Sequence, residues 1–186
     1  MIDLKIILAS TRPGRKGPAV AEWVMTQAKA HDAFKAELLD LAVINLPFLD
    51  EKEHPRLKKY EHQHTKDWSA KIDPADAFIF VTCEYNFSFP APLKNALDFL
   101  YQEWNHKPAA FVSYGGIAGG IRAVEALKNV LVAQKMTPLT ESVHIPFFTQ
   151  HIVDGVFQAD EKLNKSAEAM FKSLQQWVPA LKMMRS

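Results

Sequence analysis

The sequence has little of several features, and each shortage excludes a class of protein. Its 186 residues include one cysteine, so an internal disulfide and the CxxC spacing of a zinc site are excluded. Asp3 and Lys5 interrupt the first apolar run, and no stretch is long and apolar enough to span a bilayer. We therefore expect neither a signal peptide nor a membrane partner, and a cytoplasmic location.

A surplus of charge of either sign is also missing. The 22 basic and 21 acidic residues leave a formal net charge of +1. Proteins that bind nucleic acid or anionic membranes through their overall charge carry a basic excess, so we expect no nucleic-acid partner. The length suits one domain with a substantial core, and the chain shows no repeat, low-complexity stretch or linker. Residues 1–186 are therefore predicted to form a single domain.

Glycine is scarce, and its placement is informative. Of seven glycines, two lie within residues 14–17 and four within residues 115–120. Glycine is needed where φ is positive or where a ligand approaches the backbone closely. The two clusters predict two loops with such a requirement.

Strand-like and helix-like runs alternate along the chain. The expected strands are residues 4–9, 36–41, 77–82, 108–114 and 137–145, and the expected helices are 18–30, 92–104, 120–134 and 160–182. This alternation predicts an α/β fold, with a parallel sheet covered by helices on both faces. Residues 45–68 break the alternation and are expected to form a surface excursion. Its histidines, His54, His62 and His64, are expected to be solvated rather than metal-bound.

Three unusual loops follow strands of the expected sheet. They are residues 10–18, 83–91 and 113–120. Because the carboxyl ends of parallel strands meet at one edge of a sheet, all three loops are expected at the same edge, where ligands of such folds bind.

The first loop, STRPGRKGP, combines hydroxyls, arginines and the start of a helix. Exposed N–H groups, the helix dipole and the forked donors of arginine all favour an anion such as phosphate. The Walker A and Gly-x-Gly-x-x-Gly patterns are both absent, which disfavours a P-loop and a dinucleotide bound in the Rossmann manner.

The second and third loops carry aromatic side chains and bare backbone, which suit a flat ring. The stretch CEYNFSFP supplies phenol, amide and phenyl groups, and SYGG supplies a phenol and two glycines. A phosphate loop at one strand end and ring loops at the next two indicate a mononucleotide. The flavodoxin-like strand order 2-1-3-4-5 places FMN at this position.

Three segments resemble the NAD(P)H-dependent FMN reductase family, which includes quinone, azo and chromate reductases. They are STRPGRKGPAVAEWV at 10–24, EYNFSFPAPLKNALDFLYQEW at 84–104 and SYGGIAGGIRAV at 113–124. The resemblance implies a flavodoxin-like three-layer sandwich with a five-stranded parallel sheet. It assigns the FMN phosphate to Ser10, Arg12, Arg15 and the backbone of Gly17, Pro18 and Ala19. It assigns the isoalloxazine to Glu84, Tyr85, Asn86, Phe87, Ser113, Tyr114, Gly115 and Gly116.

The resemblance also implies an activity and an assembly. FMN would be bound, NADPH or NADH would be the co-substrate, and a ping-pong reaction would pass hydride through FMN to a quinone, azo compound, flavin or similar small-molecule acceptor. No catalytic side chain and no metal are expected, because the cofactor carries the chemistry. Helix 92–104 would help to form a homodimer, alone or within a tetramer.

Two other functions remain open at this point. The first is a non-enzymatic FMN electron carrier or redox-linked partner protein, against which the arginines and the near-neutral charge argue. The second is a thiol enzyme using Cys83, which needs a histidine within reach. The family usually has proline where this chain has Cys83, and cysteine restores an N–H donor and loosens the turn. We therefore expect the flavin affinity or potential to differ from that of relatives with proline.

Overall fold

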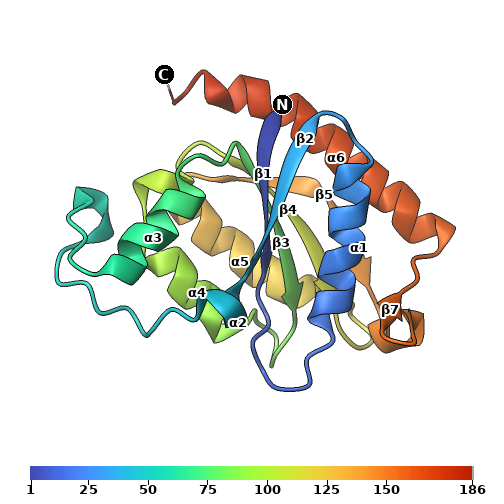
Figure 1. The fold of residues 1–186 in the computed structure, drawn as a ribbon. Helices are drawn as coiled ribbons and strands as arrows, with labels where there is room; N and C mark the ends of the chain where they lie inside the picture. Colours follow the sequence, from blue (N-terminus) through green and yellow to red (C-terminus); the bar gives the residue numbers. More distant parts are fainter. Residues whose placement is uncertain (186) are drawn as a thin grey trace.

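The computed structural model describes residues 1–185 and contains a five-stranded parallel sheet between two layers of helices (Figure 1). The strands are β1 (Ile2–Leu8), β2 (Phe34–Asp40), β3 (Ala77–Cys83), β4 (Pro108–Tyr114) and β5 (Thr137–Ile145). They pair in the order β2-β1-β3-β4-β5, and every pair is parallel. The predicted flavodoxin-like order is confirmed.

Helices cover the two faces of the sheet unequally. α1 (Gly17–Lys29) and α6 (Glu161–Lys182) pack on one face, and α3 (Gln63–Ile72), α4 (Ala91–Asp98) and α5 (Ile121–Ala133) pack on the other. Side chains of a strand alternate between faces. Ile79 and Val81 of β3 therefore join the core under α1 and α6, whereas Phe78 and Phe80 join the other core.

The predicted helix 92–104 is too long. α4 ends at Asp98, and a separate 3₁₀ turn, η2, spans Gln102–Trp104. A continuing helix would need the carbonyl of Leu97 for a backbone N–H. That carbonyl accepts shorter hydrogen bonds from two side chains, Trp104 Nε1 at 3.1 Å and Gln134 Nε2 at 2.7 Å, than from the backbone N–H of Leu100, at 3.4 Å. Side chains distant in the sequence thus end the helix.

The segment 45–68 was expected to be a surface excursion, but it contains part of helix α3. α3 buries Thr65, Trp68 and Ile72, and Trp68 is only 1% exposed. Its first turn lies beside Glu51, whose carboxylate accepts hydrogen bonds from the backbone N–H groups of Glu61 and His62. The helix α2 (Leu41–Ile44) and the 3₁₀ turn η1 (Pro55–Leu57) complete this region.

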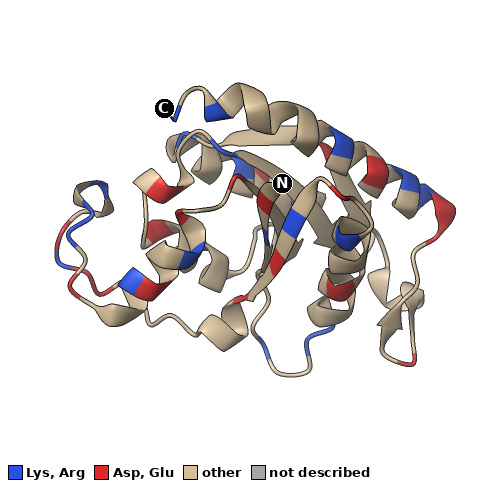
Figure 2. Cartoon of the chain, turned by 45° about the horizontal axis from the view of Figure 1, so that its top comes forward, with Lys and Arg blue, Asp and Glu red and all other residues tan. Residues whose placement is uncertain are grey.

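The chain after β5 adds a small element that the sequence pattern did not indicate. A 3₁₀ turn, η3 (Phe148–His151), leads into a hairpin of β6 (Ile152–Val153) and β7 (Val156–Phe157). Across the molecule, basic and acidic residues are interspersed (Figure 2). Within residues 1–185, no helix is long and apolar enough to cross a membrane, and no cluster of His, Cys, Asp and Glu is arranged to hold a metal ion.

Candidate cofactor site

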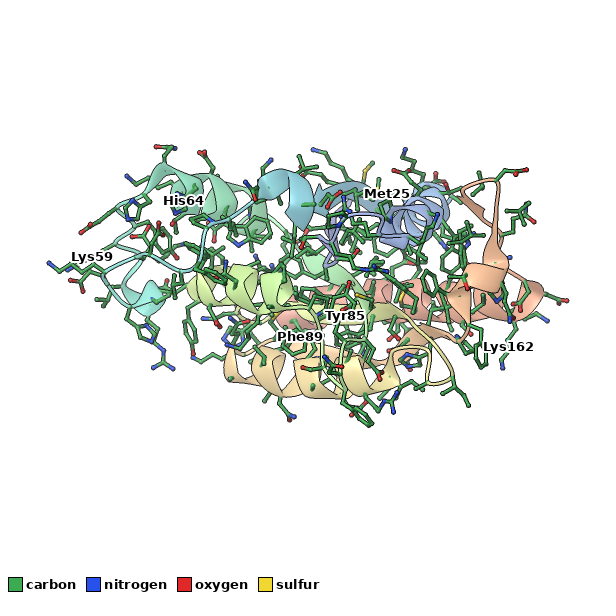
Figure 3. The ribbon with its side chains drawn as sticks, turned by 90° about the horizontal axis from the view of Figure 1, so that it is seen from below. Met25, Lys59, His64, Tyr85, Phe89 and Lys162 are labelled. Atoms are coloured by element: carbon green, nitrogen blue, oxygen red, sulfur yellow. The ribbon has the colours of Figure 1, made fainter. Side chains whose placement is uncertain are left out.

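A cavity of about 330 Å³ opens where β1, β3 and β4 end. Figure 3 looks onto this edge of the molecule, with Tyr85 near its middle. Eight of the residues predicted to bind cofactor line the cavity: Ser10, Arg12, Arg15, Glu84, Tyr85, Tyr114, Gly115 and Gly116. The remaining lining residues are Lys16, Cys83, Phe147, Phe148 and Thr149. The three loops expected at one edge of the sheet therefore do meet there.

The first loop owes its shape to a β-turn. The N–H of Arg15 donates to the carbonyl of Arg12 at 3.2 Å, with Pro13 second in the turn and Gly14 third at φ +71°. Proline at the second position and glycine at the third are the residues that a type II turn requires. The turn directs the chain from β1 into α1 and leaves Arg12 exposed at the cavity.

Arg15 is committed to a structural contact. Its terminal nitrogens bind both carboxylate oxygens of Asp40, at 2.6 and 2.5 Å, and one also donates to the carbonyl of Ser10. Burial alone would raise the pKa of Asp40, but Arg15 and the N–H of Ala42 outweigh it and hold that pKa below its ordinary value. Arg15 therefore ties the first loop to the end of β2, and its fork is already satisfied.

The start of α1 forms the basic end of the cavity. Arg12 and Lys16 line this end together with the hydroxyl of Ser10. The backbone offers fewer free N–H donors than predicted. Pro18 has no N–H, and the N–H of Ala19 already donates to the carbonyl of Lys16 at 3.2 Å. The backbone donor that remains from the predicted group 17–19 is Gly17, the first residue of the helix.

A buried polar chain joins the basic end to the aromatic end. The hydroxyl of Tyr114 donates to Ser10 Oγ at 3.1 Å, and Sγ of Cys83 lies within hydrogen-bonding reach of Tyr85 and Tyr114. A Cβ on Gly17 would collide with both Tyr114 Oη and Ser10 Oγ. Glycine at this position thus lets the Tyr114 phenol reach across the cavity floor.

The surroundings of Cys83 argue against a thiol enzyme. The residue is 7% exposed, and its partners are phenols rather than a histidine. Burial raises the pKa of the thiol above its usual value. Activated cysteines have depressed pKa values, so Cys83 is an inert neighbour of the cavity.

The second loop contains a strained tight turn. Tyr85 and Ser88 exchange backbone hydrogen bonds of 2.9 and 3.0 Å, and the two residues between them, Asn86 and Phe87, have φ of +49° and +69°. Left-handed backbone costs non-glycine residues roughly 1–3 kcal/mol each, least for asparagine. Neither residue lines the cavity, and the side chain of Phe87 is 68% exposed.

Ser113 faces away from the cavity, although it was predicted to lie in the ring site with Tyr114. Neighbouring residues of a strand point to opposite faces, so the two side chains cannot share one site. The hydroxyl of Ser113 donates to the carbonyl of Gly119 at 2.7 Å, so its oxygen accepts from His144 Nδ1, also at 2.7 Å. Because His144 is the donor, the pair does not resemble a serine nucleophile with its base.

A fourth wall of the cavity was missed at the sequence level. The N–H groups of Phe147 and Phe148 donate to the carbonyls of Gly116 and Gly115, at 3.1 and 3.3 Å, and the rings of Tyr114 and Phe148 lie 4.7 Å apart. Phe147 is held at φ +46° and is half exposed at the opening. The signal was available, because Phe147 lies two residues after the end of the expected fifth strand, at the same edge of the sheet.

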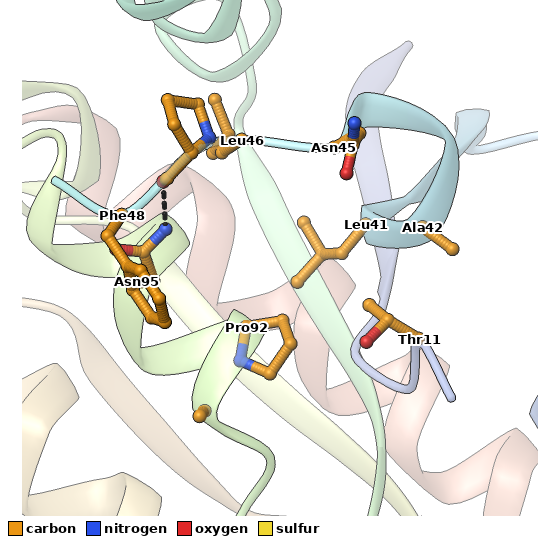
Figure 4. A pocket seen from close by; sticks show the side chains of 10 residues that line it. Thr11, Leu41, Ala42, Asn45, Leu46, Phe48, Pro92 and Asn95 are labelled. Carbon is orange, nitrogen blue, oxygen red and sulfur yellow. Dashed lines mark hydrogen bonds between the residues drawn. The ribbon is translucent and has the colours of Figure 1, made fainter. Parts of the chain in front are cut away.

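A second cavity, of about 470 Å³, lies on the other side of Thr11 (Figure 4). It is enclosed by α2, the start of α4 and the chain between them, which Asn95 fastens by donating to the carbonyl of Pro47 at 2.7 Å. Its lining residues are apolar, hydroxyl or amide. The larger cavity therefore lacks the cations that a phosphate requires, and the smaller one has them.

Comparison with known proteins shows the family to which the chain belongs. The family model described as NADPH-dependent FMN reductase matches residues 2–150. The chain belongs to the NADPH-dependent FMN reductase family. An NAD(P)H-dependent FMN reductase of Schizosaccharomyces pombe is 41% identical over 155 residues, which are 81% of this chain and 76% of that protein.

Two more distant similarities cover more of the chain. An NADPH azoreductase of a Bacillus strain is 27% identical over 171 residues, covering 90% of this chain and 86% of that protein. The structure of FerB, a flavoenzyme NAD(P)H:(acceptor) oxidoreductase from Paracoccus denitrificans, superposes with a TM-score of 0.78 at 22% identity, over 97% of this chain and 98% of that one. The protein is thus an NAD(P)H-dependent oxidoreductase of the FMN reductase type, with a flavodoxin-like fold.

Proposed function

We propose that the cavity binds FMN, and that the protein uses it to carry electrons from NAD(P)H to small organic acceptors. The observation that carries the proposal is the polarity of the cavity, which is cationic at one end and aromatic at the other. Ser10, Arg12, Lys16 and the N–H of Gly17 would hold the phosphate, since arginine forks and helix starts are the usual phosphate donors.

An orphaned oxygen supports the fit at the ring end. Glu84 lines the cavity with a side chain only 9% exposed, and its Oε2 is buried without a hydrogen-bond partner. A buried carboxylate oxygen without a partner is costly, so a donor is expected there. An N–H of a bound heterocycle would supply that donor, while Tyr85, Tyr114 and Phe148 supply flat apolar surface.

When bound, FMN supplies the two-electron transfer between NAD(P)H and the acceptor. The chain's own residues need only bind and orient the ring and keep water from one face. Tyr114 and Phe148 would cover one face of the ring. Their own rings pack together, and hydrogen bonds fasten Tyr114 to the first loop and Phe148 to the third. Phe147 and Tyr85, both partly exposed at the opening, would contact whatever approaches the ring.

The acceptors we propose are uncharged or weakly charged aromatic molecules, such as quinones and azo compounds. At the aromatic end of the cavity, the lining side chains of Tyr85 and Phe147 are 39% and 49% exposed, so they can contact such a molecule. An azoreductase among the relatives supports the same class.

We also propose that the protein forms a homodimer through α4 and the chain beside it. Val43, Phe48 and Leu49 are exposed by 80, 87 and 43%. Asn95 fastens this segment to α4 by accepting from the N–H of Leu49 at 3.0 Å and donating to Pro47. We call Val43, Phe48 and Leu49 the α4-side apolar patch. Several large apolar side chains exposed within one short segment, here residues 43–49, are typical of a protein–protein contact.

Binding of FMN and of riboflavin by the apoprotein, measured by quenching of flavin fluorescence, tests the proposal. FMN is expected to bind at least about tenfold more tightly than riboflavin, because only FMN carries the phosphate. The double variant Arg12→Ala, Lys16→Ala should narrow that gap without weakening riboflavin binding. Arg56→Ala, which removes an exposed arginine stacked on Tyr101 in another region, is the matched control. Equal affinity for the two flavins would refute the assignment of the basic end.

A further inference from the structure

The strained turn of the second loop is held by a residue that lies outside the cavity. Arg122, the second residue of α5, forms an ion pair with Glu84, with Nε 2.6 Å and Nη2 2.5 Å from Oε1. The same guanidinium carbon lies 4.0 Å from the centre of the Phe87 ring. The side chain of Arg122 therefore contacts Glu84, which precedes the turn, and Phe87, which is the second of its two left-handed residues after Asn86.

The position of Arg122 is unfavourable for its own helix. The N-terminal turn of a helix carries partial positive charge and favours acidic residues, and α5 has no acidic residue there. An arginine in the first turn goes against this preference for acidic residues. Residues that go against a local preference tend to occur where a functional or tertiary contact requires them. The carboxylate of Glu84 offsets the charge, since it lies against the guanidinium at the helix start.

Arg122 and Glu84 differ in burial, and this difference separates their roles. Arg122 is 43% exposed and does not line the cavity, whereas Glu84 does and is almost fully covered. Oε1 of Glu84 is engaged by Arg122, whereas Oε2 of the same carboxylate is buried without a hydrogen-bond partner. The ion pair thus fixes the orientation of a carboxylate that belongs to the cavity lining.

We infer that Arg122 is a positioning residue that clamps the Glu84–Ser88 turn in its ring-binding conformation. A planar fork that is both paired with a carboxylate and stacked on an aromatic ring is a role that lysine cannot reproduce. Because α5 follows directly from the glycine loop 113–120, the clamp also couples two walls of the cavity. The effect on flavin binding rests on the proposed FMN function, whereas the effect on the turn does not.

Hydrogen–deuterium exchange of the apoprotein tests the clamp without any cofactor. In Arg122→Ala, exchange in the peptide covering residues 84–90 should rise at least about tenfold, because the turn amides of Tyr85 and Ser88 lose their protection. Arg122→Lys should resemble Arg122→Ala rather than the wild type. The matched control is Lys128→Ala, on the same helix, which removes an ion pair to Glu125 and a contact 6.0 Å from the Phe111 ring. It should leave this peptide unchanged.

FMN titration of the same variants completes the test. Arg122→Ala and Arg122→Lys should each weaken FMN binding about tenfold, with Lys128→Ala at the wild-type value. Unchanged exchange of residues 84–90 in both Arg122 variants would overturn the clamp, even if FMN binds. Increased exchange in a protein whose wild type does not bind FMN would uphold the clamp and refute the proposed function instead.

Discussion

At the scale of single residues, the site depends on contacts made by atoms that are not themselves ligand donors. The Tyr114 hydroxyl reaches Ser10 across the strand ends, and it can do so only because residue 17 has no side chain. Arg15 shapes the first loop through Asp40 rather than offering its fork to the cavity. Both residues were predicted to contact the cofactor, and the structure gives each a role in building the cavity.

Replacement of Gly17 by alanine tests this reading of the cavity floor. The new Cβ would lie far inside contact distance of Tyr114 Oη and Ser10 Oγ, and Tyr114 is only 3% exposed, so it has little room to move. Overpacking of this kind costs about 1–3 kcal/mol, which exceeds the roughly 0.5–1 kcal/mol that alanine gains over glycine within a helix. We expect a lower free energy of unfolding and FMN binding weakened about tenfold or more.

The double variant Gly17→Ala, Tyr114→Phe provides the control, because removing the hydroxyl relieves the closest clash. Part of the lost stability, measured by urea denaturation, should return. A Gly17→Ala protein that is as stable as the wild type and binds FMN equally well would contradict the account.

At the scale of elements, the alternation of strands and helices, and the meeting of parallel strands' carboxyl ends at one edge of the sheet, predicted most of the fold. They did not predict the contacts that decide where individual helices begin and end. The sheet order and the meeting of three loops followed from five apolar runs and their spacing. The early end of α4 could not be predicted, because it depends on Gln134, which lies 37 residues beyond Leu97. Ser113 could have been excluded from the ring site, since Tyr114 next to it points to the opposite face.

Helix α3 was not expected either, because its start is stabilised by Glu51, which lies outside the helix in the sequence. This contact leads to a prediction about Glu51. Burial alone would raise the pKa of Glu51, but the nearby hydroxyl of Thr65 and the hydrogen bonds from the N–H groups of Glu61 and His62 hold that pKa below its usual value. A carboxyl whose pKa is lower in the folded state contributes stability above its unfolded pKa. This contribution is lost as the pH falls through the folded pKa.

Glu51→Gln should therefore lower the free energy of unfolding by about 1 kcal/mol at pH 7. The difference from the wild type should shrink as the pH falls from about 5 toward 3, because the wild-type carboxyl becomes protonated there. Urea denaturation across this pH range measures both effects, and Glu53→Gln, an exposed acid in the same segment, is the control. A constant difference at every pH would show that Glu51 does not act through its charge.

At the scale of the whole molecule, the two cores share one sheet, because the central strands send alternate side chains into both. We propose on this basis that residues 1–186 form one domain. In the proposed dimer, the α4-side apolar patch would be the surface that the second copy covers.

The proposed dimer predicts a specific effect of Phe48→Glu. Phe48 is 87% exposed in a single chain, so a charge there should not affect folding, but it would be buried without a partner in a dimer. Sedimentation should show a dimer for the wild type and a monomer for the variant, with equal thermal stability at low concentration. Val132→Glu, at an exposed valine of α5 outside the patch, is the control. A monomeric wild type would refute the dimer.

The most direct test of the central claim is reduction of the FMN-loaded protein by NADPH in the absence of oxygen, followed by the visible absorbance of the flavin. The account predicts a yellow protein that NADPH bleaches rapidly and that an added quinone restores to yellow. An FMN-loaded protein that stays yellow with both NADPH and NADH would contradict it and would indicate an electron carrier.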